Sequence, residues 1–204
     1  MPRRDQQSRQ PVVRIRQGVW TVPSINLRTT ASINVRLRNE ATGSGSTCRR
    51  ILEALPAWFG VPRSFEDCVA ASDRLPAAIA SVGNDDVGIL TWLMHTPLVA
   101  EVYVLGVVPD FHHQDVDRRL LCHVESSIAK CGVNVLQVKT LSPRTPDDGY
   151  ERTRSFYLSC GFRPVERVTD TRGQKNPALV MFKPVRRSIP AHRAVRSAGT
   201  SSRT

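Results

Sequence analysis

VYVLGVVPDFHHQDVDRRLLCHVESSIAKCG, residues 102–132, decides the fold class, because the spacing of its apolar residues changes once along its length. The part before Pro109 is an almost continuous apolar run of the kind found in buried strands. Beyond the polar segment that follows, apolar residues recur at helical spacing, and Gly132 supplies a helix stop. The members of that apolar face are Val116, Leu120, Leu121, Val124, Ile128 and Cys131. The stretch therefore predicts a strand, a loop and a helix over about 114–131.

The sequence upstream of this stretch predicts further strands and two helices. Residues 33–38 alternate apolar and polar side chains, which is the period of a half-buried strand. Two short helices, separated by Gly60 and Pro62, are expected between Cys48 and Ala71. LPAAIASV (75–82) and VGILTWLMH (87–95) are expected to form a hairpin, and LVAEVYVLGVV (98–108) adds a third strand. Three strands in succession indicate an antiparallel meander.

The sequence downstream predicts one more helix among three strands. VNVLQVKTL (133–141) is a mostly apolar run of the buried-strand type, and RTPDDG (144–149) is expected to be a loop. A helix over about 151–160 follows, ended by Gly161, and strands are expected near 163–169 and 178–183. The predicted order is β, α, α, β, β, β, α, β, α, β, β. The fold class is therefore α/β, with a mixed sheet in one α+β domain.

This order resembles the GNAT superfamily of N-acetyltransferases over roughly residues 33–184. Two segments carry the resemblance: the V-x-P turn at Val107–Pro109 and the F-Y-x-x-x-G-F segment at Phe156–Phe162. The L-P-x-W-F-G segment at Leu55–Gly60 is similar to small bacterial members, most of which have no assigned substrate. The resemblance implies an acyl-CoA N-acyltransferase fold, with a central, mostly antiparallel, splayed sheet flanked by helices.

The resemblance also implies how acetyl-CoA, the acyl donor of this family, would bind. The strands at 99–108 and 134–141 would splay apart and leave backbone groups to pair with the pantetheine arm. A backbone N–H near Val107 or Val108 would polarise the thioester carbonyl. The alternative for Gly106, Val107 and Val108 is an ordinary strand interior.

The cofactor loop departs from the family pattern. The family binds the pyrophosphate on a loop written Q/R-x-x-G-x-G/A that opens a helix. The corresponding residues here, with the arginine that follows, are His112, His113, Gln114, Asp115, Val116, Asp117 and Arg118. One carboxylate about 6 Å from a phosphate charge costs about 3 kcal/mol at an effective dielectric near 20, on the order of a hundredfold in affinity.

Two hypotheses about this loop stay open. In the first, Asp115 and Asp117 turn outward into water and His113, Arg118 and Arg119 compensate for them. In the second, Asp115 caps the helix, which gains from the carboxylate what it would otherwise gain from phosphate. The chain would then be a non-catalytic GNAT-like module with an interaction or regulatory role.

The resemblance implies catalytic residues as well. Tyr157 stands where the family keeps a tyrosine whose hydroxyl reaches the coenzyme sulfur, and a phenol can protonate a departing thiolate. Its alternative is a core aromatic. Glu101, on the strand leading to the loop, is the candidate general base, with His95 as a second candidate. Either side chain could instead be a surface group. Asp147, Asp148 and Tyr150 are candidates for shaping the acceptor site, although loop polarity alone would explain them.

The charge of the chain lies in its ends. Residues 1–50 hold ten arginines against two acidic residues, and residues 186–204 hold five arginines and no acidic residue. Residues 51–185 carry a net charge of −2 out of +11 for the chain. We therefore expect a disordered basic arm at 1–32, one domain at 33–185 and a disordered basic tail at 186–204. A specific nucleic-acid partner is not expected, although the arginine-rich ends could bind nucleic acid weakly.

The remaining composition narrows location and cofactors. No apolar run approaches the roughly 20 residues that span a bilayer, and the opening lacks the apolar stretch of a secretory signal. The expectation is a cytoplasmic protein without a membrane partner. The five cysteines are scattered without a C-x-x-C pair, so we expect buried free thiols and no metal site. The predicted acceptor is an amine of a small molecule or peptide, and the sequence leaves the oligomeric state open, a homodimer included.

Overall fold

The computed structural model describes residues 34–59, 62–144, 147–168 and 177–186. The predicted arm at 1–32, residues 187–204 of the predicted tail and Gly60 lie outside the described residues. The strands are β1 (Val35–Glu40), β2 (Ala77–Val82), β3 (Asp85–Thr96), β4 (Val99–Val107), β5 (Val135–Leu141), β6 (Arg163–Val168) and β7 (Ala178–Pro184). The helices are α1 (Gly45–Glu53), α2 (Pro56–Phe59), α3 (Pro62–Arg74), α4 (Val116–Lys130) and α5 (Asp148–Ser159), with a 3-10 turn at Pro109–Phe111.

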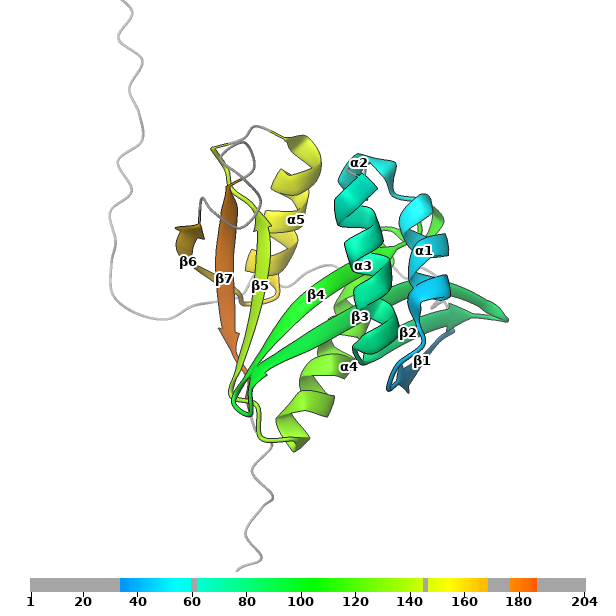
Figure 1. Ribbon diagram of the computed structural model, residues 1–204, viewed down its shortest axis with the longest axis horizontal. Helices are drawn as coiled ribbons and strands as arrows, with labels where there is room; N and C mark the ends of the chain where they lie inside the picture. The colour runs from blue at the N-terminus through cyan, green and yellow to red at the C-terminus, as the bar shows by residue number, and fades with distance from the viewer. Residues whose placement is uncertain (1–33, 60–61, 145–146, 169–176, 187–204) are drawn as a thin grey trace, which may run out of the picture. The chain divides into compact units, whose positions relative to one another are not determined.

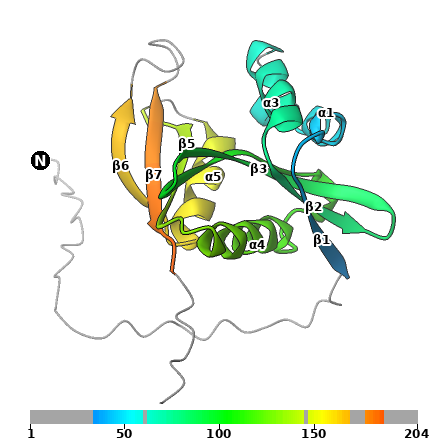
Figure 2. The same ribbon diagram turned by 60° about the horizontal axis from the view of Figure 1, so that its bottom comes forward.

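The seven described strands form one sheet in the order β1-β2-β3-β4-β5-β7-β6. Every neighbouring pair is antiparallel except β4 and β5, which run parallel. Helices α1 and α3 cover one face of the β1–β4 half, and α4 lies against the other face (Figures 1 and 2). The predicted α/β fold with a mostly antiparallel sheet flanked by helices is confirmed.

Apolar side chains fill both faces of the sheet. On the α4 face, Val116, Leu120, Leu121, Val124 and Ile128 are all buried, as the helical spacing predicts. The opposite face packs Ile51 and Leu52 of α1 against β2, β3 and β4. None of the described helices is both long and apolar enough to cross a membrane.

Three local expectations were wrong. Two prolines, Pro56 and Pro62, each begin a helix, so three helices stand where two were expected, in keeping with the tolerance of proline in a first helical turn. Helix α5 starts at Asp148 and not near residue 151, because the Asp147 carboxylate accepts the Tyr150 N–H at 2.9 Å and caps it. Since α4 ends at Lys130, Cys131 is exposed, as is Cys122, so the expectation of buried thiols does not hold for these two.

Candidate functional site

Strands β4 and β5 separate after a short stretch of pairing. They pair only from Val99 to Val102, opposite Val135 to Val138, although β4 continues to Val107 and β5 to Leu141. A bulge marks the separation, because Thr91 of β3 pairs with Val104 whereas Trp92 pairs with Val102, which leaves Tyr103 as the extra residue. Figure 1 shows β4 and β5 diverging toward the α2 and α5 end. We call this region the β4–β5 divergence; it confirms the predicted splay.

The hydrogen bonds of β4 show which backbone groups face the divergence. The Val108 N–H donates to the Val87 carbonyl on β3 at 2.9 Å, so Val108 cannot be the predicted polarising group. Because successive N–H groups in an antiparallel ladder point to opposite sides, the N–H groups of Val107 and Leu105 point away from β3, toward β5. Val107 stays a candidate, and Leu105, closer to the point of separation, joins it.

The loop that follows β4 keeps a glycine-like backbone although it contains no glycine. His113 and Asp115 have φ angles of 60° and 59°. Left-handed φ values are uncommon for residues other than glycine, and aspartate is among the side chains that tolerate them. Asp115 therefore holds, directly before α4, a left-handed conformation of the kind that glycine adopts most readily, at the position where the family pattern has glycine.

The two loop carboxylates lie in different surroundings. Asp115 makes no capping hydrogen bond, so the expectation that it caps α4 was wrong; its side chain is 80% exposed, and its Oδ1 lies 3.7 Å from Arg118 Nε. Asp117 is half-buried, and its Oδ1 accepts the Arg118 N–H at 2.8 Å. Asp117 thus occupies one of the first-turn amides of α4, whereas Asp115 turns into water. Arg119 instead donates to the Val35 carbonyl at 2.9 Å, on the β1 side of the helix.

The side chains of His112 and Gln114 turn back onto the backbone. His112 Nε2 lies 2.7 Å from the Val107 carbonyl, and since a carbonyl only accepts, the imidazole is the donor. Gln114 Nε2 donates to the Asp110 carbonyl at 2.7 Å. His113 is exposed, and the apolar Val116 is buried in the core. Of the loop side chains, Arg118 is the cation that remains beside the start of α4.

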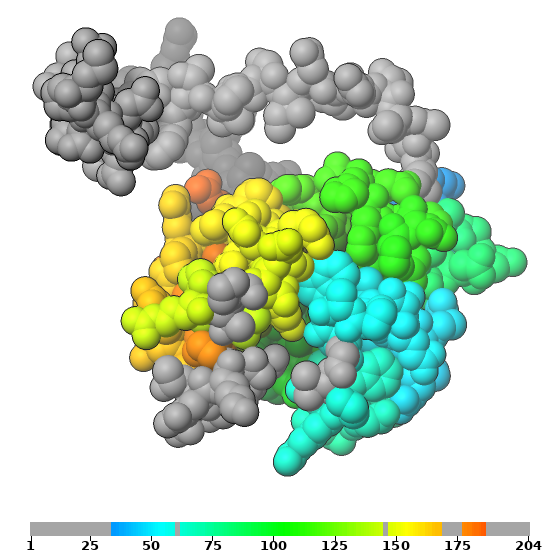
Figure 3. All heavy atoms as spheres, turned by 90° about the horizontal axis from the view of Figure 1, so that it is seen from above, coloured from blue at the N-terminus to red at the C-terminus, as the bar shows by residue number. Residues whose placement is uncertain are grey.

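Helix α2 contacts α5 at the end of the sheet toward which β4 and β5 diverge. Figure 3 shows the α1–α3 and α5 segments in contact. The Trp58 indole donates to the Thr153 hydroxyl at 3.2 Å, and the Tyr150 hydroxyl donates to the Trp58 carbonyl at 3.1 Å. The Trp58 and His112 rings meet edge to face, with centroids 6.2 Å apart. Trp58 therefore links α5 to the loop that follows β4.

Tyr157 lies on the α4 side of the sheet. It is 5% exposed and packs edge to face against Phe156 and Phe162, with ring centroids 5.2 Å away in each case. Burial raises the pKa of the Tyr157 hydroxyl well above its ordinary value. Within the described part of the chain, this hydroxyl has no recorded hydrogen bond. Tyr157 is therefore a protonated phenol and a weaker acid than an exposed tyrosine.

Glu101 is the centre of a polar network on the opposite face of the sheet. Its Oε2 lies 2.6 Å from His95 Nε2, 2.8 Å from Gln137 Nε2 and 2.9 Å from Lys139 Nζ. Burial alone would raise the pKa of the Glu101 carboxyl, but the hydrogen bonds from Lys139, His95 and Gln137 lower it below its ordinary value. We call these four residues the Glu101 network. It holds Glu101 as an anion, which leaves the carboxylate a weak base.

Sequence reasoning missed several residues near the divergence. Gln137 and Lys139 alternate with apolar residues in VLQVKTL, so their period of two could have placed both on one face of β5. Trp58 lies in the L-P-x-W-F-G segment, but no feature of the sequence indicates its hydrogen bond to Thr153. Thr140 Oγ1 is buried without a partner in the described ranges, and neighbouring residues gave no hint of it.

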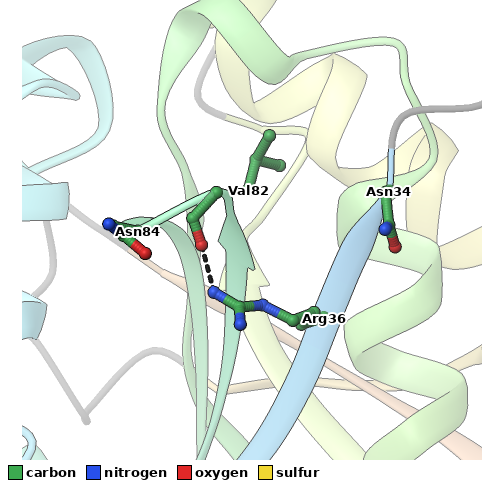
Figure 4. A pocket seen from close by; sticks show the side chains of 5 residues that line it. Asn34, Arg36, Val82 and Asn84 are labelled. Carbon is green, nitrogen blue, oxygen red and sulfur yellow. Dashed lines mark hydrogen bonds between the residues drawn. The ribbon is translucent and has the colours of Figure 1, made fainter.

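The surface hollow drawn in Figure 4 lies elsewhere. It is lined by Asn34, Arg36, Val82, Gly83 and Asn84, at the β1 edge of the sheet. The Arg36 guanidinium donates to the Gly83 carbonyl across it. Because β2 and β3 separate β1 from β4 in the sheet order, this hollow is not part of the predicted site.

Comparison with known proteins identifies the fold. No protein-family model and no curated protein sequence matches the chain. Among solved structures, an acetyltransferase assigned to the GNAT family from Desulfovibrio desulfuricans is similar with a TM-score of 0.65, at 18% identity over 74% of this chain and 99% of that chain. The ribosomal-protein-S18-alanine N-acetyltransferase from Escherichia coli gives 0.58, at 17% identity over 78% and 97%.

An aminoglycoside 6′-N-acetyltransferase in complex with coenzyme A gives a TM-score of 0.57, at 16% identity over 76% of this chain and 98% of that chain. The chain therefore has the fold of the GNAT N-acetyltransferases. The resemblance inferred from the sequence is confirmed at the level of the fold.

Proposed function

We propose that the protein is an acyltransferase that moves an acetyl group from acetyl-CoA to an amine of a small molecule or peptide. The observation that carries this proposal is the β4–β5 divergence, with four paired positions followed by backbone groups on β4 that face away from β3. Backbone groups in such a position need a partner, and an extended pantetheine arm with its two amides has the shape and polarity of a strand.

The residues at the divergence fit the cofactor in part. Leu105 and Val107 would offer N–H groups to the arm, and the buried Thr140 hydroxyl beside it lacks a partner in the described ranges. The left-handed backbone at His113 and Asp115 suits a loop that presents amides to a phosphate. Against this, Asp117 already occupies the Arg118 N–H. The arm is therefore accommodated better than the pyrophosphate.

Each remaining residue has a role that follows from its surroundings. Bound acetyl-CoA would supply a thioester carbonyl as the electrophile and a thiolate as the leaving group. Of the Leu105 and Val107 N–H groups, the one that lies at the thioester would stabilise negative charge on the carbonyl oxygen. Tyr157 would donate a proton to the leaving sulfur, although burial raises its pKa and makes it a weaker acid than an exposed tyrosine. Glu101 stays a candidate general base, although its lowered pKa makes it a weak one.

Binding of the cofactor tests the proposal. The thermal unfolding midpoint of the full chain is measured with an excess of acetyl-CoA, and with the same excess of adenosine 3′,5′-bisphosphate as a control that lacks the pantetheine arm. A ligand at one hundred times its Kd stabilises the folded state by about 2.7 kcal/mol, which gives a rise of several degrees. A rise with acetyl-CoA and a smaller one with the control is expected. No rise with acetyl-CoA would contradict the proposal.

A second candidate is a GNAT-like module that does not bind acetyl-CoA. The Asp117 carboxylate on the Arg118 amide favours it, because the helix start is then already satisfied by an anion. In that case the wild-type protein shows no rise in unfolding midpoint, whereas the Asp115→Gly, Asp117→Gly double variant does. A rise in both proteins would reject this candidate.

A further inference from the structure

The Glu101 network contains the imidazole of His95, the second candidate base, to which the proposed function above assigns no step. We infer that His95 takes the proton from the acceptor amine, and that Glu101 is a positioning residue that fixes the tautomer of His95. This inference rests on the proposed acetyl transfer. It follows from where the protons of the network lie, how exposed its members are, and which face of the sheet they occupy.

The short contact between His95 and Glu101 fixes one proton. The Glu101 carboxyl is held ionised by its three neighbours, so the proton in the 2.6 Å contact must sit on His95 Nε2. Gln137 Nε2 also lies 3.0 Å from this ring nitrogen, but a nitrogen that carries a proton cannot accept, so the amide donates to Glu101 at 2.8 Å. His95 Nδ1 is then the ring nitrogen with a free lone pair.

Exposure separates the roles of the two side chains. The His95 side chain is 34% exposed, whereas the Glu101 side chain is 6% exposed and accepts three hydrogen bonds. Within the described ranges, His95 Nδ1 has no recorded hydrogen bond. The charged groups that face the imidazole are Glu101 from β4 and Lys139 from β5, which pair at 2.9 Å and balance each other.

The network and Tyr157 lie on opposite faces of the sheet at the point where β4 and β5 separate. Ala100 and Val102 pack into the core on the α4 side, which also contains Tyr157, so Glu101 between them faces the other side. Glu101 pairs with Gln137 one position before the last paired residues, and Lys139 is the first residue of β5 beyond them. A proton acceptor and a proton donor thus flank the divergence.

The protons of the transfer balance with these two residues. The amine nitrogen forms a bond to the acyl carbon and gives one proton to His95 Nδ1, while the carbon–sulfur bond breaks. The sulfur takes the proton of the Tyr157 hydroxyl. Water then removes the proton from the imidazolium and returns one to the Tyr157 phenolate. In sum, one proton moves from the amine nitrogen to the sulfur. An acceptor that starts as an ammonium ion must first release one further proton to water.

The first test needs no acceptor. The full chain labelled with ¹⁵N-histidine is studied by NMR at neutral pH, and the His95→Gln variant identifies the His95 signals. The expected result is a protonated Nε2 and an unprotonated Nδ1, and in Glu101→Gln a mixture of the two tautomers. A proton on Nδ1 in the wild-type protein, or the same tautomer in Glu101→Gln, overturns the inference whether or not transfer is ever observed.

The second test measures release of free CoA from acetyl-CoA. The amine probes are a peptide with an N-terminal alanine and an aminoglycoside, which correspond to two structural neighbours. His95→Ala should lower kcat/KM by roughly 100-fold or more, remove the acidic limb of its pH profile, and recover activity with added imidazole. Glu101→Gln should keep the acetyl-CoA-dependent rise in unfolding midpoint and shift that limb to lower pH. The matched control is His123→Ala. His123 is hydrogen-bonded to Asn39 at 3.0 Å, and its replacement should change neither kcat/KM nor the pH profile.

The outcomes separate the two proposals. Transfer by the wild-type protein that persists unchanged in His95→Ala overturns the role of His95 and leaves the proposed function intact. A loss of activity that imidazole does not restore, together with a lower unfolding midpoint, assigns His95 to structure and also overturns its role. Absence of acetyl-CoA binding in the wild-type protein contradicts the proposed function, and with it the catalytic role of His95, whatever tautomer the NMR finds.

Discussion

The Trp58 indole N–H donates to the Thr153 hydroxyl at 3.2 Å, and this bond joins a four-residue helix to α5 across 95 positions of sequence. The same hydroxyl donates to the Gly149 carbonyl at 3.0 Å, so Thr153 serves both its own helix and α2. Gly149 lies directly under the indole, where an added Cβ would stand 3.3 Å from Trp58 Nε1. The contact therefore holds α2 and the start of α5 together at the open end of the β4–β5 divergence.

Thr153→Val removes this hydroxyl at nearly constant volume. Because it leaves the Trp58 N–H without its acceptor in a half-buried contact, we expect the free energy of unfolding to fall by about 1 kcal/mol. Urea unfolding followed by tryptophan fluorescence measures it. Thr153→Ser keeps the hydroxyl and should lose clearly less; a larger loss in Thr153→Ser than in Thr153→Val would show that the methyl group, and not the hydrogen bond, holds α2.

The two loop aspartates should differ in their effect on acetyl-CoA binding. Asp117 is half-buried and holds the Arg118 amide, so Asp117→Ala both removes a charge and frees an N–H donor. We expect its Kd for acetyl-CoA to fall about tenfold, a change of about 1.4 kcal/mol. Asp115 is exposed to water and lies near Arg118, so solvent screens its charge. We therefore expect Asp115→Gly to change the Kd for acetyl-CoA by less than about threefold. Isothermal titration calorimetry gives both values, and the reverse order would show that the Asp115 carboxylate faces the phosphates.

The expectations from sequence were confirmed where apolar residues recur at a regular spacing, because that spacing shows which side chains are buried. The helical spacing after Gln114 placed five residues on the buried face of α4, because a helix needs one apolar stripe to pack on a sheet. They failed where a single residue changes the geometry. The bulge at Tyr103 reverses the alternation of β4, so Leu105 packs on the α4 side while Glu101 faces the opposite side. Sequence alternation alone would have put these two residues on one face.

The loop shows a second kind of limit. From sequence, Asp115 can be either a helix cap or an unfavourable replacement for glycine, and both follow from sound principles. The choice depends on its φ of 59° and on the missing capping hydrogen bond, two properties of the folded loop that no local sequence pattern specifies. The Glu101 network is similar, since its donors come from β3 and β5 on either side of β4, and no local pattern predicts the register of these strands.

The Glu101 network should make part of the stability depend on pH. Because the folded-state pKa of Glu101 is lowered, the carboxylate contributes its stability fully above its unfolded pKa, about 4.3, and loses it as the pH falls through the folded value. The difference in unfolding free energy between wild type and Glu101→Gln should therefore shrink as the pH falls below about 4. Urea unfolding at several pH values measures it. A difference that persists unchanged at pH 3 would mean that Glu101 is not ionised in the folded protein.

Tyr157→Phe separates the structural role of the ring from the chemical role of its hydroxyl. The ring packs against Phe156 and Phe162, and phenylalanine keeps those contacts. The hydroxyl has no recorded hydrogen bond in the described part of the chain, so its removal should change the free energy of unfolding by less than about 0.5 kcal/mol. If the hydroxyl protonates the leaving thiolate, kcat for release of CoA should fall by roughly 100-fold, while the acetyl-CoA-dependent rise in unfolding midpoint stays.

Tyr157→Ala is the contrasting variant, since loss of the buried ring should cost about 3 kcal/mol or more. Unchanged kcat in a stable Tyr157→Phe protein would mean that water or another group supplies the proton, and that Tyr157 belongs to the core alone.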